Sequence, residues 1–338
     1  LYFKTNSGVP QGSILVNAVT IEINDELLKS DLSIEPTKTE AEVITKKRNS
    51  RKRNVRIKVV DHPIVPSPAL RYLGVWLDNN GTFNTHVEKI CDKVSSVIRT
   101  FSCILPNTKG PSFLKRKLIT SAVLSVVFYG VNIWAASRVS KANIRKLTRA
   151  IRPIKARLCM AYRTVSSSAL DIISGIPPME FLIEEKVRLM NKEEDKAVIK
   201  AETRQKWIES WNATPEKDSW LKQLITDPES WLTREHGEPN FFITQALSGH
   251  GVFNGFLHRI GVSTTDSCPH CERFTVVSFQ KQITSSKENW SSIGTFLKAS
   301  LTAKRKTLDQ LTPPMYARRQ FPGPQTDLKP SSSRKSCP

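Results

Sequence analysis

Two cysteines near the C-terminal end have the spacing of half a zinc site. Cys268 and Cys271 stand three residues apart, an arrangement that can place two thiolates around one ion. A closed structural zinc site requires four ligands, and residues 272–280 contain neither a cysteine nor a histidine. His258 or His270 could complete the set, although His270 lies between the two cysteines. We therefore expect no bound zinc, and two free thiols near the surface instead.

A glycine-rich string near the N-terminal end has the composition of a ligand-binding loop. It covers residues 8–13 and reads GVPQGS. Its two glycines, Gly8 and Gly12, allow the backbone to approach a ligand closely, because they carry no β-carbon. Gln11 between them offers a side-chain amide that can donate and accept hydrogen bonds.

Positive charge is concentrated in one segment. The chain has 51 lysines and arginines against 31 acidic residues, a net charge of +20. The 78 residues between Asp92 and Asp171 contain 15 of the cations and no carboxylate. A surface that is merely soluble mixes both signs, so this segment favours contact with nucleic acid, whose phosphates release counterions when cations bind them. The cations expected to contact the nucleic-acid backbone are Lys115, Arg116, Lys117, Arg145, Lys146 and Arg149.

A second cluster, residues 46–58, holds eight cations and no acid. We weigh a solvated loop and a nucleic-acid contact equally there. The composition, 39% hydrophobic and 24% charged, permits a packed core and excludes wholesale disorder. Six scattered cysteines indicate a reducing compartment rather than a disulfide scaffold. No signal peptide is expected, and the most apolar stretch, residues 122–136, is too short to span a membrane.

The first 80 residues predict a small β-rich region. Residues 41–45 suit a short strand, and residues 55–59 alternate apolar and basic side chains, the period of a half-buried strand. Residues 72–77 predict another strand, closed by a turn over residues 78–81.

Basic helices are predicted next. Apolar residues spaced three and four apart predict one helix from Thr85 to Phe101 and another from Ile144 into Pro153. Between them a further helix is expected to bury one apolar stripe and to expose its lysines and arginines. That stripe consists of Leu114, Leu118, Ala122, Val126, Tyr129 and Ile133.

The C-terminal part is predicted to contain a mixed-charge helix over residues 180–201 and a disordered basic tail after residue 311. Four tryptophans follow the mixed-charge helix within 30 residues of its end. They could stack on bases, but we favour core packing for them. They are Trp207, Trp211, Trp220 and Trp231.

Three strings in the first 75 residues resemble conserved parts of reverse transcriptases. The GVPQGS string resembles the nucleotide-pocket motif, residues 36–40 resemble the palm segment that carries a lysine, and residues 70–75 resemble the hairpin that grips the primer end. The resemblance implies nucleotide or template contacts by Pro10, Gln11, Gly12, Ser13 and Lys38. It implies a primer grip at Tyr72, Leu73 and Gly74.

Further strings follow in family order, over roughly residues 5 to 305. The chain therefore resembles the reverse transcriptase of LINE-type (non-LTR) retrotransposons, in the clade that inserts into ribosomal RNA genes. Residues 105–111 and 129–134 resemble that family's thumb, and residues 157–178 resemble the segment that follows it. The C-terminal strings are residues 234–238, 247–251, 258–261 and 268–271.

The resemblance implies polymerisation with two Mg²⁺ ions held by aspartates, and those aspartates are missing. The first would precede Leu1, and no Asp-Asp dipeptide occurs in the chain. Asp25 and Glu26 occupy the interval where the family has its aspartate pair, but we read them as an ordinary helix or turn pair. Hence no catalytic residue and no bound Mg²⁺ are predicted. Decay of the element and a gene model that skipped coding segments both remain open explanations.

The expected fold is α+β and mostly helical, a truncated reverse-transcriptase palm remnant followed by a helical thumb and a C-terminal helical region. The function expected is that of a reverse-transcriptase fragment without activity of its own; the alternatives are a non-catalytic RNA- or DNA-binding module and a relic without a role. The resemblance also implies an RNA–DNA duplex as partner and residence in the nucleus. The predicted domains are residues 1–80, 81–170, 171–245, 246–310 and the tail 311–338.

Overall fold

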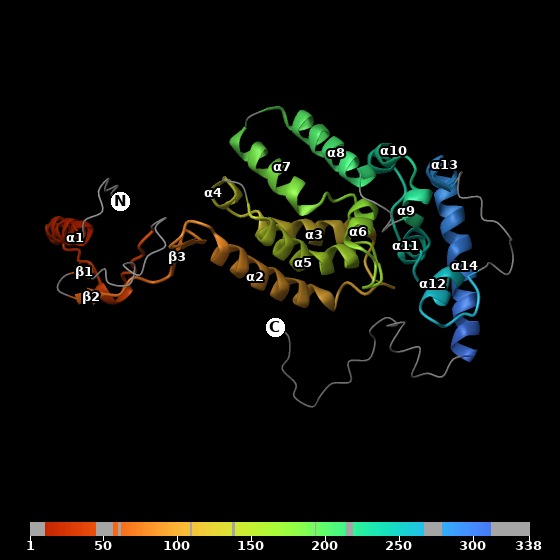
Figure 1. Cartoon of the computed structure of the whole chain (residues 1–338), viewed down its shortest axis with the longest axis horizontal. Helices are drawn as coiled ribbons and strands as arrows, with labels where there is room; N and C mark the ends of the chain where they lie inside the picture. Colours follow the sequence, from red (N-terminus) through yellow and green to blue (C-terminus); the bar gives the residue numbers. More distant parts are fainter. Residues whose placement is uncertain are drawn as a thin grey trace. The chain divides into compact units, whose positions relative to one another are not determined.

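The computed structural model describes residues 11–44, 57–59, 62–108, 110–136, 139–192, 194–213, 219–266 and 279–311. The chain divides into two compact units, Leu1–Ile90 and Cys91–Pro338, each described by itself below. Helices dominate the described residues and strands are few and short (Figure 1), which confirms the α+β, mostly helical class. Within these residues, no helix has the length and apolar character that crossing a membrane requires.

The first unit contains one long helix and two small sheets. Helix α1 (Gln11–Leu28) is followed by a 3₁₀ turn, η1 (Pro36–Lys38). Strand β1 (Ile57–Val59) pairs antiparallel with β2 (His62–Ile64), and β1 buries its two apolar residues and exposes Lys58, as the alternation predicted. The predicted strand over residues 41–45 is reduced to a single bridge between Glu42 and Ser67 within the described part of the segment.

Strands β3 (Ala69–Tyr72) and β4 (Val75–Asp78) form the second antiparallel pair. Leu73 and Gly74 make a two-residue turn, and both have positive φ angles, 45° and 86°. Such a turn matches the right-handed twist of the flanking strands. The hairpin expectation is thus confirmed, whereas the prediction of one continuous strand over residues 72–77 is wrong.

Helix α2 (Asn84–Ser102) begins one residue before the predicted start. The buried carboxylate of Asp78 accepts the backbone N–H groups of Thr82 and Asn84, both at 2.8 Å, and so satisfies donors at the helix start. The helix buries Val87, Ile90 and Val94 of the predicted stripe, whereas Val97 and Phe101 are half-buried.

Helix α3 (Phe113–Val127), the short α4 (Val131–Trp134) and α5 (Lys141–Leu158) follow. Helix α5 buries Leu147 and Ile151 as predicted but continues through Pro153, because Ile154 and Leu158 beyond it are also buried. The predicted end at Pro153 is therefore wrong.

The predicted inward face of α3 and α4 is also wrong. Five residues of the expected stripe are exposed, and only Val126 is half-buried. The buried side of α3 consists of Arg116, Thr120, Val123 and Val127. The exposed residues are Leu114, Leu118, Ala122, Tyr129 and Ile133.

The next segment forms α6 (Ser167–Ser174) and a hairpin of two helices, α7 (Met179–Asn191) and α8 (Lys196–Ala213). The prediction of one helix over residues 180–201 is wrong, because Lys192 adopts a left-handed conformation (φ 53°) that ends α7. Arg188 spans the break, with its guanidinium 2.7 Å from both Glu194 and Glu202.

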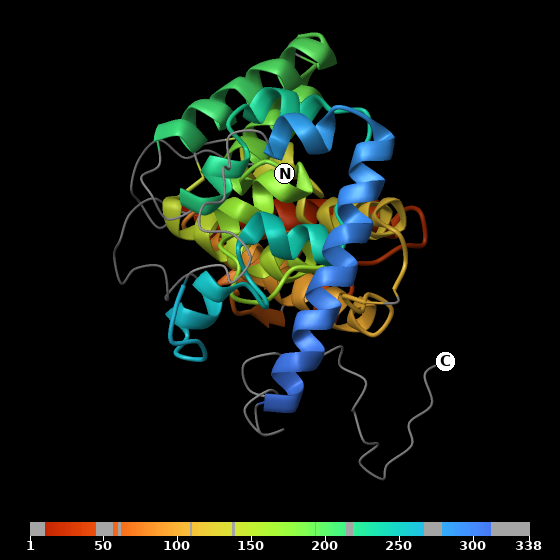
Figure 2. The same cartoon turned by 90° about the vertical axis from the view of Figure 1, so that its right-hand side faces the viewer.

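Six helices complete the described chain, and α14 runs past several of them (Figure 2). A core that joins residues 156 to 290 includes Trp207, Trp211 and Trp231, which confirms core packing for these three. Trp220 is partly exposed, and its indole N–H donates to the carbonyl of Ala246 (2.8 Å). The remaining helices are α9 (Ser219–Leu224), α10 (Pro228–Thr233), α11 (Phe241–Ser248), α12 (Asn254–Arg259), α13 (Phe279–Thr284) and α14 (Lys287–Leu311).

Candidate nucleic-acid interface

The nucleotide-pocket string lies at the edge of the described chain. Pro10 falls outside the described residues, and the backbone of Gln11, Gly12 and Ser13 forms the first turn of α1. Lys38 is exposed at the end of η1. The nucleotide contacts that the resemblance implies remain a prediction.

The primer-grip-like residues stand at the tip of the β3–β4 hairpin. The side chains of Tyr72 and Leu73 are 62% and 75% exposed, so they are available to a ligand. The backbone N–H of Ser67 donates to the carbonyl of Ala41 (2.8 Å), which joins the segment after Lys38 to the start of this hairpin.

Buried ionisable groups lie beneath the hairpin. Burial and the nearby charge of Asp78 raise the pKa of Glu42 to about 7. Burial lowers the pKa of His86 to about 4, and its Nδ1 accepts the backbone N–H of Trp76 at 3.3 Å. We therefore expect neutral His86 at physiological pH, where it holds the hairpin to the first turn of α2.

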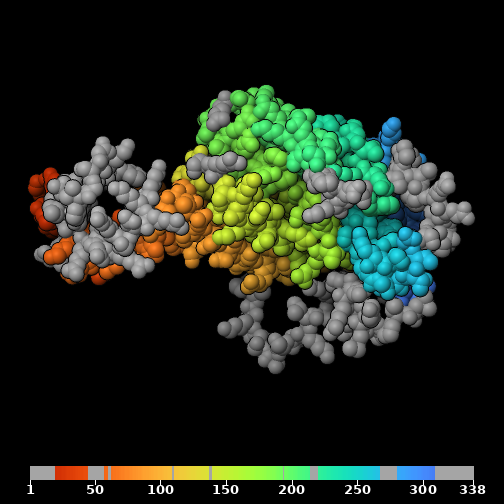
Figure 3. Space-filling model, in the orientation of Figure 1, coloured from red at the N-terminus to blue at the C-terminus, as the bar shows by residue number. Residues whose placement is uncertain are grey.

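Five of the six predicted backbone-contacting cations are exposed. Lys115 and Lys117 lie on α3, and Arg145, Lys146 and Arg149 lie on α5. Both helices belong to the 78-residue stretch without a carboxylate. Part of the surface of this region is visible in Figure 3, where the helices from α2 to α8 are coloured from orange to green.

Arg116, the sixth cation, is fully buried, so its predicted exposure is wrong. Its Nε donates to the carbonyl of Pro111 (2.9 Å), and its terminal nitrogens donate to the carbonyls of Leu105, Pro106 and Arg157. Burial and the charge of Arg157 lower its pKa. Arg116 therefore fixes the loop between α2 and α3 and does not reach a phosphate.

The thumb-like string over residues 105–111 and the start of the segment over residues 157–178 meet around Arg116. Arg157 donates to the carbonyls of Ser102 and Leu105, both at 3.2 Å, and Asn107 donates to the carbonyl of Ala161 (3.2 Å). A β-carbon at Gly110 would lie 2.3 Å from the Arg116 guanidinium, so only glycine fits there without displacing it. The residues of these strings thus pack together at one junction.

A second buried cation, Lys155, contacts the family-like segment over residues 157–178. Its ammonium lies 2.6 Å from Asp171 and donates to the carbonyls of Ile176 (3.2 Å) and Pro177 (3.0 Å). The charge pattern did not indicate this pair, although Asp171 is the carboxylate that ends the acid-free stretch. The pair ties α5 to α6 and to the start of α7.

The string over residues 234–238 also serves packing. The Arg234 guanidinium lies 4.0 Å from the ring centre of Trp231 and 5.5 Å from that of Trp290, and burial lowers its pKa to about 10. A β-carbon at Gly237 would lie 2.4 Å from Trp290. Glycine therefore permits the close approach of this loop to the ring.

Metal binding has no support from the described residues, which contain no group of three or more histidines, cysteines or carboxylates able to hold an ion. Asp25 and Glu26 lie on α1, as the helix-pair reading predicted, and Glu26 pairs with Lys29 at 2.6 Å. This pair does not fit a two-metal site. Cys268 and Cys271 lie outside the described residues, so the zinc prediction is untested.

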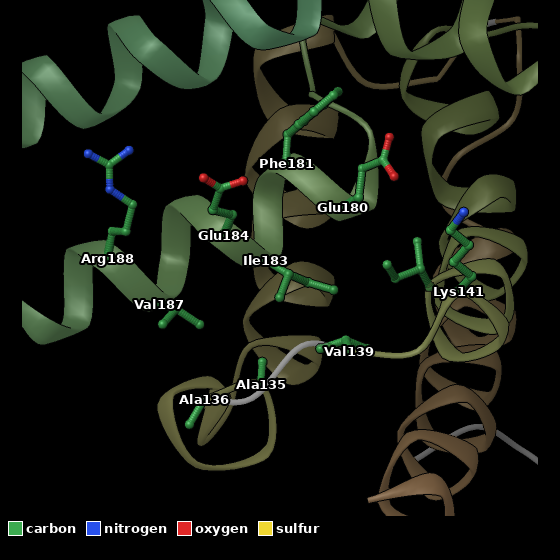
Figure 4. Close-up of a pocket in the computed structure, with 11 residues that line it drawn as sticks. Ala135, Ala136, Val139, Lys141, Glu180, Phe181, Ile183, Glu184, Val187 and Arg188 are labelled. Carbon is green, nitrogen blue, oxygen red and sulfur yellow. The ribbon is translucent and has the colours of Figure 1, made fainter. Parts of the chain in front are cut away.

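A pocket of about 440 Å³ lies among α4, α5 and α7 (Figure 4). Its walls are largely apolar, and its charged residues include Lys141 and Glu180. Arg188 and Glu184, which also line it, form ion pairs with residues of α8 or the turn before it. None of the predicted site residues lines this pocket.

No family model matches the sequence, and no solved structure matches the fold. Curated proteins do match, and all three described below come from type-1 retrotransposable elements. The chain is thus a retrotransposon-derived protein related to LINE-type (non-LTR) reverse transcriptases, as the motifs predicted.

The matching relatives are proteins of R1 elements. The chain is 24% identical over 225 residues to the 115 kDa protein of element R1DM from Drosophila melanogaster, which covers 59% of this chain and 22% of that protein. It is 26% identical over 221 residues to the retrovirus-related Pol polyprotein of element R1 2 from Nasonia vitripennis (59% and 54%). It is 22% identical over 242 residues to the Pol polyprotein of element R1 4 from the same species, a match that covers 65% of this chain and 61% of that protein. The chain therefore spans less than two thirds of each relative.

Proposed function

We propose that this chain binds RNA or an RNA–DNA duplex through the exposed cations of α3 and α5, and that it does not polymerise DNA by itself. The observation that carries the proposal is the exposure of five cations within a stretch that has no carboxylate. Phosphates along a duplex are regularly spaced anions, and a helical surface of cations can neutralise several of them at once. The kinship with R1 Pol proteins supports the same class of partner.

The binding test is the salt dependence of affinity for an RNA–DNA duplex. We expect the logarithm of the affinity to fall linearly with the logarithm of salt concentration. Replacing Arg145, Lys146 and Arg149 by alanine should flatten that slope by about 3, one unit for each lost phosphate contact.

A matched control removes the same charge elsewhere. Lys192, Lys196 and Lys200 are exposed on or beside α7 and α8, where acidic residues are interspersed. Their triple alanine variant should keep the slope nearly unchanged. Salt-independent binding, or an equal loss in both triple variants, would contradict the proposal.

Catalysis is tested by primer extension on an RNA template with Mg²⁺. The proposal predicts no product, because polymerisation by two metal ions requires carboxylates that position them, and the chain has no Asp-Asp pair. A product that disappears in the Gln11→Ala variant would refute the proposed inactivity. The same result would also establish the nucleotide role of the glycine-rich string.

We also propose that the chain resides in the nucleus, where an R1-type element would meet its target DNA. The resemblance to inserters into ribosomal RNA genes supports this location. Microscopy of a fluorescent fusion tests it, and exclusion of the fusion from nuclei would count against it.

A further inference from the structure

The outward face of α3 and α4 is apolar. The exposed fractions are 63% for Leu114, 72% for Leu118, 57% for Tyr129 and 52% for Ile133. Ala122 on α3 is also exposed. Several exposed apolar side chains within one segment of a highly charged chain favour an interaction site.

The helix cannot turn this face inward. Its opposite side carries Arg116, whose guanidinium donates to four backbone carbonyls, and Thr120, whose hydroxyl donates to the carbonyl of Arg116 (2.9 Å). Rotation of α3 would break these buried hydrogen bonds, each of which contributes to stability. The apolar stripe is therefore held outward by the fold.

The charged side chains that α3 and α4 themselves expose are positive and lie near the start of α3. Lys115 and Lys117 are exposed beside Leu114 and Leu118. From Leu118 to Ile133 the sequence contains no charged residue. A polyanion requires cations along its whole length, so most of this face does not suit phosphates. A second copy of the chain would bring another net charge of +20 against it.

We propose that this face binds an acidic amphipathic helix of a protein partner. Apolar side chains of the partner, spaced three and four residues apart, would cover Leu118, Tyr129 and Ile133. Carboxylates at one end of that helix would face Lys115 and Lys117. The proposal goes beyond nucleic-acid binding and does not depend on it.

The test uses the full chain and a fluorescent synthetic helix as a probe. The probe has about 18 residues, or five turns, with leucine on one face and glutamate on the other. We expect a rise in anisotropy with the wild-type chain. Leu118→Glu should weaken binding about tenfold or more, because it places a charge in the apolar contact and repels the probe's carboxylates.

Two variants control for folding and for position. Leu118→Glu should leave the circular dichroism spectrum and the melting temperature unchanged, since the side chain is mostly solvent-exposed. Phe296→Glu on α14 introduces the same charge at another exposed apolar residue (68%) and should not affect binding. If Leu118→Glu fails to fold, Ile133→Ser provides the second test on the same face.

Four results would overturn the proposal. The first is that the probe does not bind. The second is that a peptide with the same residues but no apolar face binds equally well, which would indicate charge attraction alone. Sedimentation that shows a dimer abolished by Leu118→Glu would assign the face to a second copy. Loss of duplex affinity in the uncharged variant Leu118→Ser would assign it to nucleic acid.

Discussion

At the residue scale, Arg116 shows that a run of cations is not a uniform surface. Successive helical residues point about 100° apart, so Lys115 and Lys117 face solvent while Arg116 is buried between them. Its partners include the carbonyls of Leu105, just after α2, and Arg157, in the last turn of α5. Carbonyls at helix C-terminal ends carry partial negative charge, which stabilises a buried cation.

We expect Arg116→Met to lower the free energy of unfolding by about 3 kcal/mol, because several buried carbonyls lose a charged donor. Lys117→Met is the matched control, and it should change stability by less than about 0.5 kcal/mol. Urea denaturation measures both. Equal effects of the two variants would contradict the buried position of Arg116.

Gly110 should be coupled to Arg116. Gly110→Ala is expected to destabilise the chain, since its β-carbon would overlap the guanidinium and approach the carbonyl of Pro106 to 2.7 Å. In an Arg116→Met background part of that overlap is gone, so the same substitution should have a smaller effect. A double-mutant cycle measures the difference, and strict additivity would show that the two sites are independent.

The raised pKa of Glu42 predicts that the stability of the first unit depends on pH. Its pKa is about 7 in the folded chain, above its ordinary value of 4.5, so its stabilising contribution is lost as pH rises through 7. Glu42→Gln has no such ionisation and should lose less stability between pH 5 and pH 8 than wild type. The stability of this region at each pH is measured by hydrogen exchange of the Thr82 and Asn84 backbone amides, corrected for intrinsic exchange rates. Identical pH profiles would refute the raised pKa.

At the element scale, periodicity predicted the buried side of a helix when one side is polar and the other apolar. It failed for a helix that is apolar on most sides. Helices α2 and α5 have polar and apolar sides, and spacing alone identified the side that each helix buries, up to Pro153 in α5. Helix α3 is apolar over most of its circumference, so the choice of its buried side depends on the hydrogen bonds of Arg116. Spacing along one helix does not contain that information.

The break between α7 and α8 lacked its usual signal, because Lys192 occupies a left-handed position that glycine normally fills. We expect Lys192→Gly to raise the free energy of unfolding by about 0.5–1 kcal/mol by removing that strain. Lys200→Gly, on the exposed side of α8, should instead lower it by about 1 kcal/mol. Thermal melts distinguish the two, and destabilisation by Lys192→Gly would mean that the strain is absent.

At the scale of the whole molecule, the family-like strings of the second unit are mostly packing determinants. Gly110, Arg157, Gly237 and Arg234 all take part in close contacts between distant segments, which is why the strings could be recognised without a catalytic centre. The sequence predicted which residues carry charge. It could not predict that Arg116 and Lys155 are enclosed, because enclosure depends on residues distant in the chain.

The enclosure of Lys155 by Asp171 has a consequence for long-range electrostatics. The carboxylate that ends the acid-free stretch is neutralised internally, so it does not weaken the positive potential over α3 and α5. After Asp92 and Asp171, the acidic side chains of the second unit begin again at Glu180, and on α7 and α8 they are interspersed with lysines and arginines. This separation gives the unit a permanent electric dipole moment, which would orient an approaching polyanion before first contact and speed productive encounters at low ionic strength.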